Sequence, residues 1–267
     1  MWWNPIDLVE VMSAFVDRLE QLSLGDAVLG DEFDTIVAAV LDDDPSAGAV
    51  AISEALEKGA GLAEIGQAVA HAAALRIGRF HTSNEFADWD AVHNTWTSCQ
   101  ALARALGRAP SLELARGLYH AAMRVHLDRF LNVPAARLPD ERSVSTQDLA
   151  FGADGLLELL DREQQVTPVA ALVDAALAAG DSDRLIAILG RAVPREDAEF
   201  HAYQTLEAGV RQYNALRQRH PLAARRTLVS ISRYVAAHSP TPRASQQTYQ
   251  IAVRLLRGDD LTVAADG

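Results

Sequence analysis

The sequence predicts an all-α fold, a multi-helix bundle of about twelve short helices. Apolar residues recur every three or four positions along almost the whole chain, which is the spacing of one helix face, and no run of strand length alternates β-branched or aromatic with polar residues. The 267 residues are 49% hydrophobic but only 6% aromatic. Helices with such small apolar side chains pack closely and need several neighbours to bury them.

Several of the predicted helices begin at a local signal. Pro45 follows Asp44, Ser111 follows a proline, and Pro221 follows His220, so a capping side chain or a first-turn proline stands where the helix amides have no partner. Asp88 precedes Trp89 in the same way. The periodicity predicts helices over residues 5–22, 31–41, 45–58, 61–79, 88–106, 111–131, 145–161, 167–179, 183–192, 196–218, 221–237 and 242–257.

The helical body is predicted to form one domain over residues 1–257. Its longest polar connection, from Leu131 to Ser145, contains two prolines and is also compatible with a division near 132–145. Residues 258–267 are predicted to form a flexible tail.

Composition excludes several classes of protein. A net charge of -12 opposes general binding to nucleic acid, and the single cysteine excludes a disulfide scaffold. No stretch is long and apolar enough for a membrane span, and the N-terminus lacks the pattern of a secretory signal, so we expect a cytoplasmic protein without membrane association. Cys99 lies inside a predicted helix and is interpreted as buried and inert.

A first cluster of polar residues surrounds the start of the helix at 88–106. Asp90 and His93 are three positions apart, so they project from neighbouring places on one helix face, while His81 and Glu85 come from the preceding loop. Imidazole and carboxylate groups are the usual ligands of non-haem iron and other transition metals. The segment therefore predicts a histidine-rich metal site.

A second cluster lies at the start of the helix at 196–218, where Asp197 precedes His201 by four positions. If the two helices face each other, His81, His93 and His201 converge with one carboxylate. Trp89, Trp96 and Tyr203 are then expected to line a substrate or cofactor pocket beside the metal.

The carboxylates also have a structural interpretation. Asp88 and Asp90 in one helix, and Glu196, Asp197 and Glu199 in the other, are interpreted as first-turn residues that the helix dipole favours. The chain has no Glu-x-x-His sequence, which argues against a ferritin-like di-iron centre. His126, His220 and His238 are interpreted as residues of the surface or of helix ends.

Arginines gather between Arg211 and Arg233 without an acidic residue among them. Such a region can dock an acidic electron-transfer partner, although a solvated helix face explains it as well.

Four segments together resemble the helical region of actinobacterial proteins that carry a Rieske iron–sulfur domain. They are Arg79–Thr82 continuing to His93, Asp128–Pro134, Arg195–Ala208 and Ala237–Arg243. A Rieske cluster needs two cysteines and two histidines, and this chain has only Cys99. It therefore resembles the helical module without its Rieske domain, and the resemblance implies a redox context.

These observations predict an oxidoreductase, oxygenase-like, with a non-haem metal bound by His81, His93 and His201 and completed by Asp90 or Glu85. One alternative is a non-catalytic helical module for protein interaction or ligand binding, in which the histidines only join helices. A second alternative is a haem binder with an axial histidine, which the low aromatic content disfavours.

Overall fold

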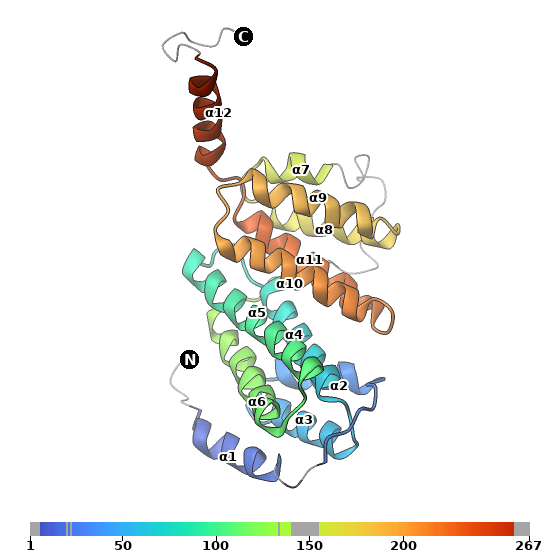
Figure 1. Cartoon of the computed structure of the whole chain (residues 1–267). Helices are drawn as coiled ribbons and strands as arrows, with labels where there is room; N and C mark the ends of the chain where they lie inside the picture. Colours follow the sequence, from blue (N-terminus) through green and yellow to red (C-terminus); the bar gives the residue numbers. More distant parts are fainter. Residues whose placement is uncertain (1–5, 20, 22, 133, 140–154, 259–267) are drawn as a thin grey trace.

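The computed structural model describes residues 6–19, 21, 23–132, 134–139 and 155–258. These residues form twelve α-helices and one short 3-10 helix, with no strand among them, which confirms the all-α prediction (Figure 1). The helices are α1 (Leu8–Leu19), α2 (Glu32–Leu41), α3 (Ala47–Glu57), α4 (Leu62–Gly78), α5 (Phe86–Arg108), α6 (Leu112–Leu127), η1 (Asp128–Leu131), α7 (Gly155–Leu160), α8 (Val166–Ala178), α9 (Ser182–Arg195), α10 (Phe200–Leu216), α11 (Pro221–Ala237) and α12 (Ala244–Arg257).

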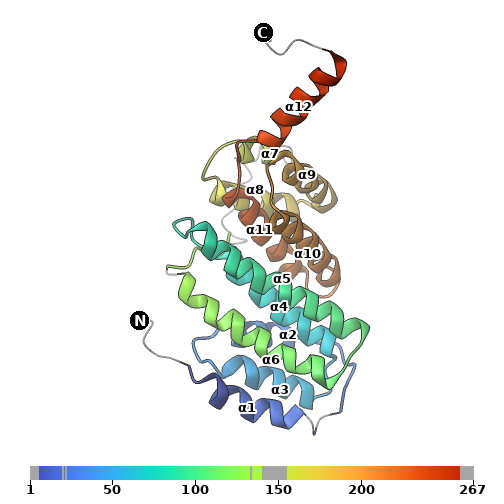
Figure 2. The ribbon, with the colours of Figure 1, turned by 60° about the vertical axis from the view of Figure 1, so that its left-hand side comes forward.

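The helices pack as two groups that share one core. Helices α1 to α6 form one group and α7 to α11 the other, and they meet where α4 and α5 contact α10 and α11 (Figure 2). Helix α12 leaves the body at the end opposite α1 and α3 in both views. One continuous hydrophobic cluster includes residues from every α-helix of both groups and none from α12. Half of the residues of the predicted division near 132–145 lie outside the described ranges.

Helix α4 lies at the centre of this core because its sequence is unusually rich in alanine and glycine. It contacts α2, α5, α6 and α11 and is buried along most of its length. A Cβ added to Gly66 would lie only 2.9 Å from the Cα of Ala103 in α5. The close approach of α4 and α5 thus requires a residue without a side chain at this position.

Most helix boundaries within the described ranges agree with the prediction, and the predicted caps at two starts are observed. The predicted helix start at 145 and nearly all of the predicted tail at 258–267 lie outside those ranges. The Ser111 hydroxyl accepts a hydrogen bond from the amide of Leu114 at 3.2 Å, and Pro221 occupies the first turn of α11. Helix α5 begins at Phe86, two residues earlier than expected, with Asp88 in its first turn. None of the helices that the structure describes could span a bilayer.

The start of α10 corrects one prediction. The helix begins at Phe200, and residues Glu196 and Glu199 have extended backbone. Glu196 and Asp197 therefore precede the helix and are not first-turn residues. Their carboxylates bind the segment that leads into α12.

One cysteine and two histidines are buried in the core. Cys99 is buried, as predicted, and burial raises the pKa of its thiol to about 12. His71 is buried in α4 with its Nδ1 3.2 Å from the Thr227 hydroxyl of α11, a contact that joins the two helix groups. His126, interpreted from the sequence as a residue of the surface or of a helix end, lies in the last turn of α6 and is buried, and its Nδ1 lies 3.1 Å from the carbonyl oxygen of Asp42.

Candidate functional site

A cavity of about 570 Å³ lies at the junction of the two helix groups. Its walls come from the N-terminal parts of α5 and α10, the last turns of α9 and α11, and the segments that connect α7 to α8, α9 to α10 and α11 to α12. The lining residues are Asp90, Glu163, Gln164, Val193, Glu196, Asp197, Ala198, Glu199, His201, Ala202, Tyr234, Val235, Ala237, His238, Ser239, Pro240, Thr241 and Pro242. Five of them are acidic and none is lysine or arginine.

Four rings from three helices are packed in a continuous series along one side of the cavity. His93 of α5 lies 4.9 Å from His201 of α10 and 5.2 Å from Tyr234 of α11, measured between ring centroids. The Tyr234 ring stacks at 4.1 Å on His238, the residue that ends α11. His201 and His238 line the cavity, whereas His93 is fully buried behind them.

The position of His238 follows from the end of its helix. Its Nδ1 lies 2.8 Å from the carbonyl oxygen of Tyr234, which no longer has a partner within α11 at this point and accepts a hydrogen bond from the imidazole. This bond turns the ring back over Tyr234 and toward the cavity.

His93 is the most unusual group at the site. Neither of its ring nitrogens forms a hydrogen bond with any described residue, although the side chain is fully buried. Burial, and then the neighbouring His201, lower the pKa of His93 to about 4, so the ring is neutral at pH 7. A buried imidazole without partners costs stability, and such groups often lie at functional sites.

Burial and the nearby carboxylates both shift the pKa values of these rings. Burial and then the carboxylate of Asp90 raise the pKa of the Tyr234 hydroxyl well above its usual range. Burial likewise lowers the pKa of His238. Burial thus favours the neutral forms of the Tyr234 phenol and of the His93 and His238 imidazoles.

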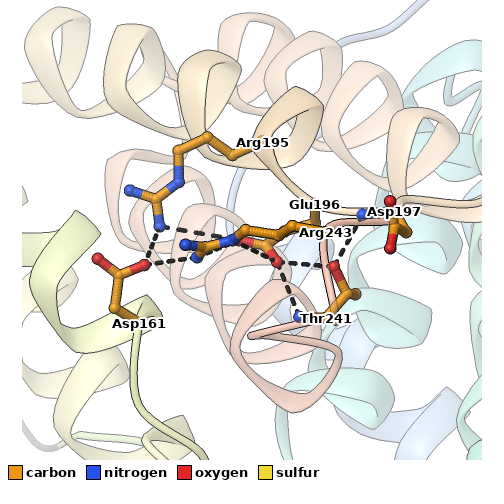
Figure 3. A network of polar contacts seen from close by, with 6 residues as sticks. All are labelled: Asp161, Arg195, Glu196, Asp197, Thr241 and Arg243. Carbon is orange, nitrogen blue, oxygen red and sulfur yellow. Dashed lines mark hydrogen bonds and ion pairs between the residues drawn. The ribbon is translucent and has the colours of Figure 1, made fainter. Parts of the chain in front are cut away.

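A network of ion pairs forms the wall of the cavity next to α12 (Figure 3). The guanidinium of Arg243 contacts Glu196 at 2.8 Å and Asp161 at 2.5 Å, and Arg195 also contacts Asp161 at 2.5 Å. The Glu196 carboxylate accepts two further hydrogen bonds, from the amide and the hydroxyl of Thr241. This network joins α7, α9 and the segment before α12.

The carboxylate of Asp197 caps the start of α12. It accepts hydrogen bonds from the backbone amides of Ala244 at 2.6 Å and Ser245 at 2.8 Å, and its own amide donates to the Thr241 hydroxyl (Figure 3). Because the first amides of a helix have no partner within it, these bonds set the direction in which α12 starts.

The predicted metal ligands are separated into two places. Asp90 and His201 line the cavity and His93 is buried behind them, whereas His81 is not among the lining residues and has its Nδ1 2.7 Å from the Ser83 hydroxyl. Glu85 is exposed at the N-cap of α5. In the described part of the chain, no three His, Cys, Asp or Glu side chains are placed to hold one metal ion. The metal site remains a prediction.

The three predicted lining residues lie outside the lining of the cavity. Trp96 is fully buried, and its indole nitrogen donates a 2.8 Å hydrogen bond to the side-chain oxygen of Gln212. Tyr203 is exposed beside Arg104, on another side of α10. Trp89 is buried behind the cavity, with its ring edge toward Tyr234 at 6.3 Å.

Tyr234, His238 and Glu199 are the site residues that sequence reasoning missed. Tyr234 belongs to an apolar helical pattern that looks like ordinary core. His238 was interpreted as a residue of the surface or of a helix end, and it does lie at the end of α11, but no role at a site was predicted for it. The one local signal is that both lie in the last turn of a helix, four positions apart and thus on one face.

The arginines between Arg211 and Arg233 do not act as one exposed patch. Arg233 is buried, and its guanidinium donates to the carbonyl oxygen of Phe80 at 3.2 Å. Four of the others have local contacts: Arg211 with Glu207, Arg219 with Glu64 at 3.0 Å, Arg225 with Asp174 at 2.5 Å, and Arg217 over the Tyr213 ring. Docking of an electron-transfer partner here remains a prediction.

No family model, curated protein or solved structure matches the chain. The resemblance to the helical region of Rieske-domain proteins therefore remains a prediction. The residues that line the cavity are the remaining guide to function.

Proposed function

We propose that the chain is a ligand-binding protein that holds a small organic cation in the cavity between α5, α10 and α11. The observation that carries this proposal is the charge of the lining, which contains five carboxylates and no lysine or arginine. A volume of about 570 Å³ is in the range of pockets for small molecules.

Three of the five carboxylates are available to a ligand. Glu196 and Asp197 are already bound by Arg243, Thr241 and the amides of α12. Asp90, Glu163 and Glu199 form no ion pair with another residue of the described ranges, and all three line the cavity. A protonated amine is the group that such a set of acceptors binds best, because each N–H then meets a charged acceptor.

The remaining lining suits the apolar part of such a ligand. Val193, Val235 and Pro240 contribute aliphatic surface, and His201 and Tyr234 contribute aromatic surface. A cationic head group with an aromatic or aliphatic body can therefore be bound at both ends.

Calorimetric titration with benzylammonium tests the proposal. Benzyl alcohol and benzoate are matched probes of the same shape with neutral and negative charge. We expect benzylammonium to bind and the other two not to bind. Asp90→Asn is expected to weaken binding about tenfold, a loss of about 1.4 kcal/mol. Glu54→Gln, on the exposed face of α3, is the matched control and should bind as the wild type does.

Two outcomes would overturn the proposal. One is that benzoate binds as well as benzylammonium, and the other is that Asp90→Asn and Glu199→Gln both leave the affinity unchanged. Thermal unfolding of each variant shows whether a loss of binding reflects a loss of fold.

A metal-dependent oxidoreductase is the second candidate, and one observation favours it. The rings of His93 and His201 are adjacent, and Asp90 precedes His93 by three positions on the same helix. Elemental analysis of protein purified without chelator separates the two functions. A stoichiometric transition metal such as iron that is lost in both His93→Phe and His201→Ala would support the oxidoreductase, and metal-free protein that binds benzylammonium would support the cation-binding function.

A further inference from the structure

Helix α12 has an apolar face that nothing in the described chain covers. No residue of this helix is buried, and Tyr249 is 70% and Leu256 is 89% exposed. At 100° per residue, the apolar side chains occupy somewhat more than half of the helix circumference, and the polar arc contains Gln246, Gln247, Gln250, Arg254 and Arg257. An isolated amphipathic helix of this length is marginal in water and gains its stability from a partner surface.

Polar contacts hold the start of α12 in place, although no described residue covers its apolar face. The Asp197 carboxylate accepts hydrogen bonds from the first amides of α12. The guanidinium of Arg243, the residue directly before the helix, forms ion pairs with Glu196 and Asp161 (Figure 3). Both views show α12 directed away from the helices of its own body. The apolar face is therefore presented outward, where another molecule can reach it.

A groove that suits such a helix lies on the other group of helices, between α5 and α6. Small side chains line much of it on both sides, with Ala87, Ala91 and Ser98 from α5 and Gly117 and Ala121 from α6. Its lining also includes Leu102 and Cys99 and the polar side chains of Asp90, Asn94, Thr95, His120 and Arg124. From Ala87 to Leu102 the groove is about 22 Å long, and the 14 residues of α12 span about 21 Å, at 1.5 Å per residue. Small side chains allow a third helix to approach both groove walls closely.

We propose that two copies of this chain form a dimer by reciprocal exchange, in which α12 of each copy lies in the α5/α6 groove of the other. The area of the contact favours a second copy. One helix in one groove buries on the order of 1,000 Å², below the size of a stable interface, whereas two equivalent contacts bury about 2,000 Å². A two-fold dimer provides both contacts and closes on itself.

Charge argues against the other common partner of an amphipathic helix, an anionic membrane. The chain has a net charge of -12, and the polar arc of α12 carries only two arginines among its glutamines. Membrane-surface helices rely on a polar face rich in lysine and arginine. The protein partner is thus the better match for this helix.

Sedimentation velocity over a concentration series tests the dimer. Ile251→Glu/Leu255→Glu places two charges on the apolar face of α12, and Gln247→Glu/Gln250→Glu places the same two charges on its polar arc as the matched control. Ser98→Trp fills the groove from an exposed position. We expect the apolar-face variant and the groove variant each to weaken dimerisation at least tenfold, and the control to remain a dimer.

Mixing the two defective variants distinguishes exchange from a simple pairing of two α12 helices. The groove variant keeps an intact α12 and the helix variant keeps an intact groove, so the mixture can form a heterodimer with one sound contact. This heterodimer should be weaker than the wild-type dimer but stronger than the self-association of either variant. A labelled copy of one variant reports this association in the mixture.

Four results would overturn the proposal: a wild type that stays monomeric at every concentration, a dimer that neither variant weakens, a dimer that Ser98→Trp leaves unchanged, or a monomer that binds vesicles containing phosphatidylglycerol through α12. Circular dichroism confirms that each variant keeps its helices.

Discussion

The imidazole rings of His93 and His201 lie 4.9 Å apart across the contact between α5 and α10. His93 is fully buried without a hydrogen-bond partner in the described chain, and His201 reaches the cavity. The pair thus connects the interior of the α1–α6 group with the cavity at the junction of the two groups. Because the pKa of His93 is lowered, the stability of this junction should depend on pH.

His93→Phe should reduce the sensitivity of the fold to acid. The pKa of His93 is about 4 in the folded chain, below its ordinary value of about 6.5, so the unfolded chain binds more protons between these values. The wild type should lose about 3 kcal/mol through this residue as the pH falls from about 6.5 to 4, and the variant should not.

Urea unfolding at pH 7.5 and pH 4.5 measures this difference. His71 is present in both proteins, so its own low pKa of about 3 affects them equally. His120→Gln, at an exposed position, is the control. An identical pH dependence of His93→Phe and wild type would contradict the assignment.

Two glycines should respond in opposite directions to the same substitution. Gly66→Ala pushes a methyl group against the backbone of Ala103, so the free energy of unfolding should fall by about 1–3 kcal/mol. Gly190, inside α9, has no atom within 4 Å of an added Cβ, and Gly190→Ala should raise it by about 0.5–1 kcal/mol through helix propensity. Urea unfolding of both variants checks the signs, and a stabilised Gly66→Ala would mean that α4 and α5 are not so close.

Arg243→Met should destabilise the end of the body that carries α12. The substitution removes the nearer of the two guanidinium groups that contact the Glu196 carboxylate, whose side chain is only 5% exposed, and leaves it with Arg195 at 3.7 Å. Loss of one partner of a buried ion pair costs about 2–4 kcal/mol here. The double variant Glu196→Gln/Arg243→Met also removes the carboxylate charge and should recover part of the loss. Thermal unfolding of the two variants gives the comparison, and equal stability of both would contradict the role of Glu196.

Cys99 should not react in the folded protein. Its thiol is buried and burial raises its pKa to about 12, so the reactive thiolate is scarce at neutral pH. Iodoacetamide labelling followed by mass spectrometry should show an unmodified chain in buffer at pH 8 and a single modification in 6 M guanidinium chloride. Fast labelling of the native protein would show that α5 and α6 open at this position.

The elements of the fold were predictable because their signals are local. Ser111 and Pro221 mark helix starts by their own backbone chemistry, and the spacing of apolar residues marks the faces of the helices between them. The start of α10 was not predictable in this way. Glu196 and Asp197 suit a first turn by sequence, but Arg243 and the amides of α12 bind them more strongly outside the helix.

The candidate site divides along the same line. Sequence spacing alone placed Asp90 and His93 on one face of α5, and residue types alone singled out His201. Only the packing of α5 against α10 and α11 decided that His93 lies between His201 and Tyr234, that His238 turns back over Tyr234, and that His81 stays apart with Ser83. Periodicity specifies which residues share a helix face, whereas the angle and register at which two faces meet depend on how side chains from distant segments fill the space between them.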